Sequence, residues 1–127
     1  MVVPVWNGAD RLGGTLYSLW QLLESQPYSA ELVIVDDCSG PDAARVIESF
    51  RRDVGATVLR NARNQGKGFS VARGMLAARG ELRVFIDSDL AYPPTEIEAI
   101  VDTLEKGSDV AIACRVLPKS RYIMSPT

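Results

Sequence analysis

Histidine is absent from the 127 residues of this sequence. Nucleophiles that depend on a histidine base and metal centres with imidazole ligands are therefore excluded, and carboxylates become the expected metal ligands. Cysteine is rare, because Cys38 and Cys114 lie far apart and belong to no C-x-x-C pattern. A structural zinc site or a disulfide framework is not expected, and a reducing cytoplasm fits this cysteine content.

A basic excess and long apolar runs are missing as well. The sequence has 14 lysines and arginines against 16 aspartates and glutamates, so its net charge of -2 offers no basic face for nucleic acid. No run approaches the roughly 20 apolar residues of a membrane-spanning helix. No basic leader precedes the first apolar stretch. We therefore expect one soluble domain, for which 127 residues suffice.

What the sequence does contain is a regular alternation of apolar runs with helical patterns. The order strand, helix, strand predicts an α/β fold: a Rossmann-like three-layer α/β/α domain with a mostly parallel sheet. Residues 117–127 show no clear period and are expected to form a loop that stops before its next element. The expected strands are 2–5, 31–35, 56–59, 82–86 and 109–113, and the expected helices are 9–24, 41–55, 68–78 and 94–104.

Polar segments follow the carboxyl end of every expected strand. In an open α/β sheet, ligands bind beyond these ends, so segments that are distant in sequence converge on one edge. This convergence is the main physical reason to expect a binding site. The segments are 6–8, 36–37, 63–68, 87–89 and Arg115.

Asp87-Ser88-Asp89 gives the sharpest signal, because it ends the apolar run LRVFI. Residues two apart on an extended chain point to the same side. Two carboxylates aimed at one spot repel each other unless a proton or a cation joins them, and Mg²⁺ or Mn²⁺ completed by phosphate oxygens meets that need. The alternative is that Asp89 caps a turn and Asp87 is only solvated.

Asp36 and Asp37 follow the apolar run ELVIV. Ser39, with Asp42 three residues later, resembles a capping box for the next helix. That assignment leaves the two aspartates unexplained, and one of them is a candidate acceptor for a hydrogen bond from a nucleobase or ribose.

Residues 63–68 form a glycine-flanked basic loop before a helix. Lys67 beside a helix N-terminus suits a phosphate, although an ordinary turn explains the loop equally well. Trp6 is either a core residue or a platform on which a base stacks. Arg115 alone would be interpreted as a solvated surface arginine.

Together these segments resemble the family 2 glycosyltransferases with the GT-A fold, in the branch of the dolichyl-phosphate mannose and glucose synthases. The resemblance covers nearly the whole chain. It rests on a set of short motifs that occur in the expected order: VPVWNG at 3–8, VDDCS at 35–39, NQGKG at 64–68, DSD at 87–89, PP at 93–94 and CR at 114–115.

This resemblance implies a role for each matching position. The nucleoside is expected to lie among Pro4, Trp6, Val35 and Asp37, and Gly8, Lys67 and Ser88 complete the expected nucleotide-sugar site. Asp87 and Asp89 are expected to bind the metal, Mg²⁺ or Mn²⁺, and the diphosphate, and Asp89 and Arg115 to be catalytic. Two positions depart from the family pattern. Gly8 replaces the usual acidic residue, which weakens a direct contact there, and Ala91 replaces a polar residue near the metal.

The activity implied is inverting transfer of a hexose from GDP-hexose or UDP-hexose to an acceptor, a polyprenyl or dolichyl phosphate or a glycan. The metal and basic residues would stabilise charge on the leaving diphosphate. The family's catalytic domain continues well beyond this length, so residues 1–127 are expected to be its N-terminal, nucleotide-sugar-binding part. Missing segments are expected to associate it with the cytoplasmic face of a membrane.

Two other functions fit parts of the sequence. A phosphoacceptor receiver domain also has an acidic pair after an apolar strand, like Asp36-Asp37, and a later strand-end aspartate, like Asp87. However, its acidic pair ends its first strand, whereas a complete strand and helix precede the pair here. The other alternative is a nucleotide-binding fragment without catalytic activity.

Overall fold

The computed structural model describes residues 1–90 and 93–114. The chain divides into two compact units with a boundary after Pro94. The first unit contains a parallel sheet and three helices, and the described part of the second contains the helix α4 (Glu96–Glu105). None of the helices in the described residues is long and apolar enough to cross a membrane. The α/β class predicted from the sequence is confirmed.

The sheet of the first unit consists of β1 (Val2–Val5), β2 (Val33–Asp36) and β3 (Thr57–Arg60), in that order and all parallel. Pro4 lies opposite Val35 in the ladder between β1 and β2. Every residue of these two strands is buried. Their unbroken apolar character is what a parallel strand covered on both faces requires.

A further extended segment continues the sheet beyond β1. The Val2 amide donates to the Val84 carbonyl at 2.7 Å, and the Ile86 amide donates to the Val2 carbonyl at 3.0 Å. Residues 84–86 thus run parallel to β1 with a single bridge, between Val2 and Phe85. The order of segments 84–86, β1, β2, β3 is that of one half of a doubly wound sheet.

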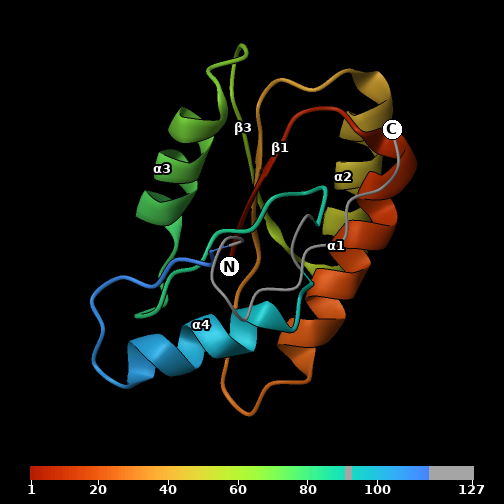
Figure 1. Ribbon diagram of the computed structural model, residues 1–127. Coiled ribbons are helices and arrows are strands. Elements are labelled where there is room, and N and C mark those ends of the chain that lie inside the picture. The colour runs from red at the N-terminus through yellow and green to blue at the C-terminus, as the bar shows by residue number, and fades with distance from the viewer. Residues whose placement is uncertain (91–92, 115–127) are drawn as a thin grey trace, which may run out of the picture. The chain divides into compact units, whose positions relative to one another are not determined.

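Helices cover both faces of this sheet (Figure 1). The helices α1 (Ala9–Glu24) and α2 (Pro41–Val54) pack against each other on one face, and α3 (Lys67–Ala77) packs on β1 and β2. α1 coincides with the predicted helix because its leucines recur at helical spacing and are buried. α2 begins at its proline and ends at Gly55, whose φ of 74° closes the helix in the left-handed conformation.

The strand predicted at 109–113 is wrong, since residues 109–114 form no strand in the part of the chain that the structure describes. An extended segment is stable only when a neighbour accepts and donates its ladder hydrogen bonds, and no described strand pairs with it. Val110 and Ile112 are accordingly 73% and 84% exposed. The expected loop 117–127 lies outside the described residues.

Gly74 permits the close approach of α3 to the sheet. A Cβ atom at this position would overlap the side chain of Val2 and would lie 2.9 Å from Cγ2 of Val35. Both valines are fully buried and stiff at χ1, so neither can move away without disturbing the core.

We predict that Gly74→Ala lowers the free energy of unfolding by about 1–3 kcal/mol, the cost of overpacking a core. The matched control is Gly14→Ala on α1, where a Cβ atom meets nothing within 4 Å. This control should raise stability by roughly 0.5–1 kcal/mol, because alanine is the better helix former. Urea unfolding followed by circular dichroism measures both, and equal effects of the two substitutions would contradict the packing argument.

Candidate functional site

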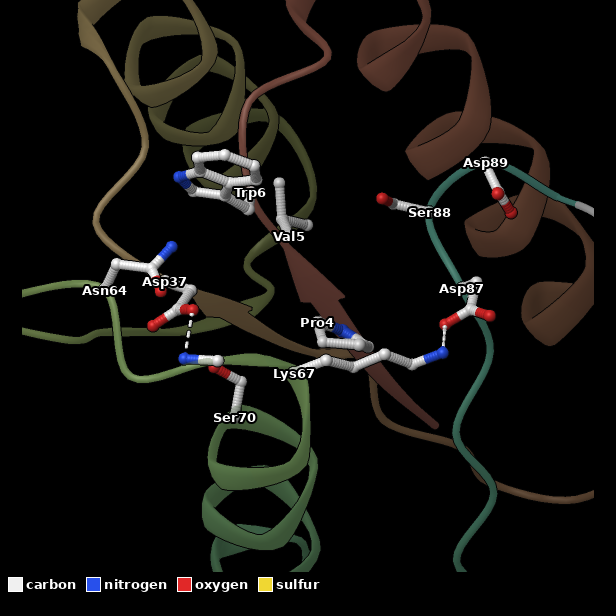
Figure 2. Close-up of a pocket in the computed structure, with 11 residues that line it drawn as sticks. Pro4, Val5, Trp6, Asp37, Asn64, Lys67, Ser70, Asp87, Ser88 and Asp89 are labelled. Carbon is white, nitrogen blue, oxygen red and sulfur yellow. Dashed lines mark hydrogen bonds and ion pairs between the residues drawn. The ribbon is translucent and has the colours of Figure 1, made fainter.

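A cavity of about 480 Å³ opens at the carboxyl ends of β1 and β2 within the first unit (Figure 2). Three further segments complete its wall: the loop before α3, the first turn of α3, and the turn after residues 84–86. This is the edge of the sheet at which the sequence pattern predicts a binding site. The lining residues are Pro4, Val5, Trp6, Asp37, Asn64, Gly66, Lys67, Ser70, Asp87, Ser88 and Asp89.

Several predicted site residues do not line this cavity. Val35 is fully buried and packs in the core with Val2 and Ala78. Gly8 is the N-cap of α1, with a φ of 77°. Arg115, predicted to contact phosphates, lies outside the described residues, as does Ala91.

Four lining residues were missing from the predicted set. Asn64 and Gly66 belong to the loop that the sequence analysis singled out, so their position after β3 was a usable signal. Val5 is the last residue of β1 and directly precedes Trp6. Ser70 gave no signal, because one serine in a helical pattern does not reveal which way it faces.

Trp6 is 63% exposed and lines the cavity, so its interpretation as a core residue is wrong. Figure 2 shows its indole at the end of the cavity where Asn64 and Asp37 lie. Lys67 and Asp87 lie at the other end. The cavity therefore combines a flat apolar surface and a carboxylate at one end with an ammonium group at the other.

The loops after β1 and β2 are tied together by reciprocal hydrogen bonds. The Asn7 amide N–H donates to Oγ of Ser39, and the Gly40 amide N–H donates to Oδ1 of Asn7, both at 2.9 Å. The capping box predicted for Ser39 and Asp42 is therefore wrong: the N-cap of α2 is Gly40, and no side chain caps the helix. The Ser39 hydroxyl is used by a residue 32 positions away instead.

Asp36 holds the turn that follows β2. Its buried carboxylate accepts a hydrogen bond from the Ser39 amide at 2.9 Å and forms an ion pair with Arg60. Arg60 also donates to the Ser39 carbonyl at 2.9 Å. The charge of Asp36 is thus neutralised within the structure, and Asp36 is not among the residues that line the cavity.

Asp37 is 4% exposed, and its carboxylate holds the loop before α3. Oδ1 accepts hydrogen bonds from Nδ2 of Asn61 and the Gln65 amide, each at 2.7 Å, and Oδ2 accepts one from the Gly66 amide at 2.8 Å. Burial alone would raise the pKa of the Asp37 carboxyl, but these hydrogen bonds, together with one from the Ser70 side chain, outweigh it and hold the pKa below its ordinary value.

Lys67 opens α3 and crosses the cavity toward Asp87 (Figure 2). Its Nζ lies 2.6 Å from Oδ1 of Asp87 and 5.9 Å from the centre of the Phe85 ring. The ion pair is partly exposed, since 59% of the lysine side chain and 33% of the aspartate side chain are accessible. An ammonium group therefore neutralises Asp87 in this structure.

The expectation that the chain stays extended from Asp87 to Asp89 is wrong. Ser88 and Asp89 lie in a turn, in which the Leu90 amide donates to the Asp87 carbonyl at 3.2 Å and Leu90 has a φ of 51°. Figure 2 shows the Asp87 carboxylate beside Lys67 and the Asp89 carboxylate directed elsewhere, on the far side of Ser88. Within the described residues, no group of three or more Cys, Asp or Glu side chains gathers to hold a metal ion.

The sequence model of the family described as "Glycosyl transferase family 2" matches residues 1–121. The chain is 28% identical over 115 residues to a dolichol-phosphate mannosyltransferase of Pyrococcus furiosus, covering 91% of this chain and 32% of that protein. It is 32% identical over 113 residues to an undecaprenyl-phosphate 4-deoxy-4-formamido-L-arabinose transferase of Edwardsiella ictaluri, covering 87% and 34%. The chain thus spans about a third of the length of the curated relatives it matches.

Solved structures agree with this match. The glucosyl-3-phosphoglycerate synthase of Mycobacterium tuberculosis, solved with Mn²⁺, UDP and phosphoglyceric acid, superposes with a TM-score of 0.64 at 28% identity. The superposition covers 81% of this chain and 37% of the synthase. The predicted GT-A fold, of which this chain represents a part, is confirmed.

Because the pKa of Asp37 is lowered, we predict that its contribution to the free energy of unfolding depends on pH. A carboxylate with a lowered folded-state pKa contributes stability above its unfolded-state pKa of about 3.9 and loses it as the pH falls through the folded-state value. Asp37→Asn should therefore be less stable than the wild type at pH 7, and the difference should shrink toward about pH 3. Urea unfolding at several pH values measures this difference. A difference that does not change with pH would contradict the assignment.

Proposed function

The chain belongs to glycosyl transferase family 2, and we propose that its first unit binds the nucleoside diphosphate portion of a sugar donor in the described cavity. The observation that carries the proposal is the chemical polarity of the cavity. A tryptophan and a buried carboxylate lie at one end, and a lysine beside an aspartate lies at the other (Figure 2). This arrangement suits a flat base at the first end and an anionic diphosphate at the second. The family membership argues against the receiver-domain alternative.

At the nucleoside end, Trp6 provides an exposed aromatic surface on which a base can stack. Pro4 and Val5 line the cavity beside it. Asp37 adds an acceptor that is held in place by hydrogen bonds from Asn61, Gln65 and Gly66, so little conformational entropy is lost when a ligand N–H or O–H binds to it. Val35, which the resemblance places here, supports Pro4 from the neighbouring strand instead.

At the diphosphate end, the donor atoms of the residues present suit a divalent cation, and the Asp89 carboxylate would have to turn toward Asp87 for both to bind the same ion. Asp87, Ser88 and Asp89 offer only oxygen donors, the type that Mg²⁺ and Mn²⁺ prefer. Two carboxylates leave several coordination positions for phosphate oxygens and water, as such ions require. When bound, the ion neutralises charge on the diphosphate. Lys67, which pairs with Asp87 in this structure, would then offer a second positive charge to a phosphate oxygen.

For the whole protein we propose transfer of a hexose from GDP-hexose or UDP-hexose to a polyprenyl or dolichyl phosphate, with inversion. The names of the relatives support the acceptor, since the two transferases described above act on dolichol phosphate and undecaprenyl phosphate. A phosphate acceptor is already anionic near neutral pH and therefore needs little help from a general base. A lipid acceptor places the reaction at a membrane surface, for which we propose the cytoplasmic face.

Within this proposal, residues 1–127 provide the donor side of the catalytic domain. Asp89 would contribute to catalysis as a metal ligand, and Arg115 through the leaving phosphate. These roles for the two residues rest on the family resemblance.

We predict that UDP or GDP binds the chain at least about tenfold more tightly with Mn²⁺ than with EDTA, the effect of adding charge-assisted contacts. Asp89→Ala should remove this metal dependence. Asp42→Ala, which removes an exposed carboxylate on α2, is the matched control and should retain it. Isothermal titration calorimetry measures all three proteins. Equal affinities with Mn²⁺ and EDTA in the wild type would rule out the metal role.

The pairing of Lys67 with Asp87 leads to a second prediction. The ammonium group competes with a divalent ion for the same carboxylate, so Lys67→Met should bind Mn²⁺ alone up to about fivefold more tightly, the value of an exposed ion pair. The same variant should bind UDP or GDP more weakly, because it has lost a phosphate-binding charge. Lys106→Met is the control, since Lys106 makes an equivalent 2.6 Å pair with Asp102 on α4. Tighter binding of Mn²⁺ together with weaker binding of UDP or GDP supports the competition for Asp87, whereas an unchanged Mn²⁺ affinity argues against it.

A further inference from the structure

Asn61 is a buried amide that follows β3 and is not among the residues that line the cavity. It is 2% exposed, and both ends of its side chain are used. Its Nδ2 donates to Oδ1 of Asp37 at 2.7 Å and to Oγ of Ser70 at 2.9 Å. Its Oδ1 accepts a hydrogen bond from Arg73 at 2.6 Å. Because every polar group has a partner, the amide has one orientation.

Protein donors hold the Asp37 carboxylate on several sides. Oδ1 accepts hydrogen bonds from Asn61 and Gln65, and Oδ2 accepts one from the Gly66 amide. The Ser70 side chain adds a further hydrogen bond to the carboxylate. Asp37 also lines the cavity, so the protein fixes this carboxylate where a ligand would contact it.

We infer that Asn61 is a positioning residue for nucleoside recognition, which fixes the Asp37 carboxylate so that it accepts a hydrogen bond from the ligand. The donor is an N–H of the base or an O–H of the ribose. This inference rests on the proposed function, because it takes the ligand of the cavity to be a nucleoside diphosphate. It adds a residue outside the cavity to the groups that set affinity for the nucleoside.

The position of Asn61 in the network explains why this amide, rather than the backbone donors, sets the orientation. Gln65 and Gly66 lie at the end of the loop between β3 and α3 that is nearest the helix, whereas Asn61 is the first residue of that loop. The backbone N–H of Asn61 donates to the Asp36 carbonyl at 2.8 Å. Arg73 on α3 polarises the amide through its carbonyl and strengthens the donation to Asp37.

The test is Asn61→Asp, which replaces the donor to Asp37 by a carboxyl group of the same shape. Two carboxylates at this separation share one proton, so the pKa of the pair rises. The charged side chain that contacts the pair is Arg73 on α3, and the ion-paired Asp36 and Arg60 directly precede Asp37 and Asn61 in the sequence. Lys67 pairs with Asp87 at the other end of the cavity. At pH 7.5 the variant should bind UDP or GDP about tenfold or more weakly than the wild type. Near pH 5 the introduced carboxyl is protonated and again donates a hydrogen bond to Asp37, so the nucleotide affinity of the variant should approach that of the wild type.

Two controls separate positioning from general destabilisation. Ile47→Val removes a methyl group from the buried face of α2 and should lower the melting temperature without a pH-dependent affinity ratio. Arg73→Met keeps the donor but removes its polarising partner, and should weaken nucleotide binding by a smaller factor at every pH. If Asn61→Asp does not fold at neutral pH, Arg73→Met still tests the inference. NMR titration of the Asp37 carboxyl without nucleotide should show a pKa higher in Asn61→Asp than in the wild type.

The outcomes distinguish the inference from the proposed function. The positioning role is overturned if the wild type binds a nucleotide and both Asn61→Asp and Arg73→Met bind it with wild-type affinity at every pH. It is also overturned if the affinity of Asn61→Asp is reduced by a factor that, as for Ile47→Val, does not vary with pH. If the wild type binds neither UDP nor GDP although Asp37 titrates as expected, the proposed function fails, and the inference with it. The 2′-deoxy and N-methylated-base forms of the bound nucleotide identify the donor. If Asn61→Asp no longer weakens the binding of one of these two nucleotide forms, the group altered in that form is the one that donates to Asp37.

Discussion

The candidate site depends on one buried carboxylate. Asp37 directly follows β2, and its hydrogen bonds with Asn61, Gln65 and Gly66 hold the loop between β3 and α3. This loop carries Asn64 and Gly66 into the cavity. A buried charge is stable only when hydrogen bonds replace the water it has lost. The loop supplies those hydrogen bonds through Gln65 and Gly66. Folding of the loop and burial of the charge are therefore one event, and the shape of the cavity follows from both.

The parallel sheet explains why these groups meet at all. Strands that run in the same direction bring their carboxyl ends to one edge, so the segments after β1, β2 and β3 become neighbours although they are far apart in sequence. Asn7 and Ser39, 32 positions apart, fasten two of these segments, and Asp36 and Arg60 fasten the second to the third. The edge is thus rigid before any ligand arrives, a condition for specific binding at modest entropic cost.

Sequence patterns within one segment predicted correctly those helices whose formation depends mainly on residues within that segment. The leucine spacing of α1 and the proline and glycine at the ends of α2 gave boundaries that agree with the structure. The strand expected at 109–113 failed because a strand is defined by its partner, which local sequence does not name. Ser39 failed as a cap because a distant asparagine uses its hydroxyl. At the site, the resemblance located Trp6, Asp37 and Asp87 at the cavity, whereas the buried network around Asn61 depends on three-dimensional contacts that no motif records.

The central claim is that the edge of the sheet beyond β1 and β2 binds a nucleoside diphosphate. Amide NMR spectra of the isotopically labelled chain, recorded while UDP or GDP is added with Mg²⁺, test this claim most directly. The account predicts saturable shifts concentrated in residues 4–8, 37–40, 61–70 and 87–89, with α2 and α4 largely unaffected. Shifts that are absent at millimolar nucleotide, or that concentrate on helices remote from this edge, would contradict it.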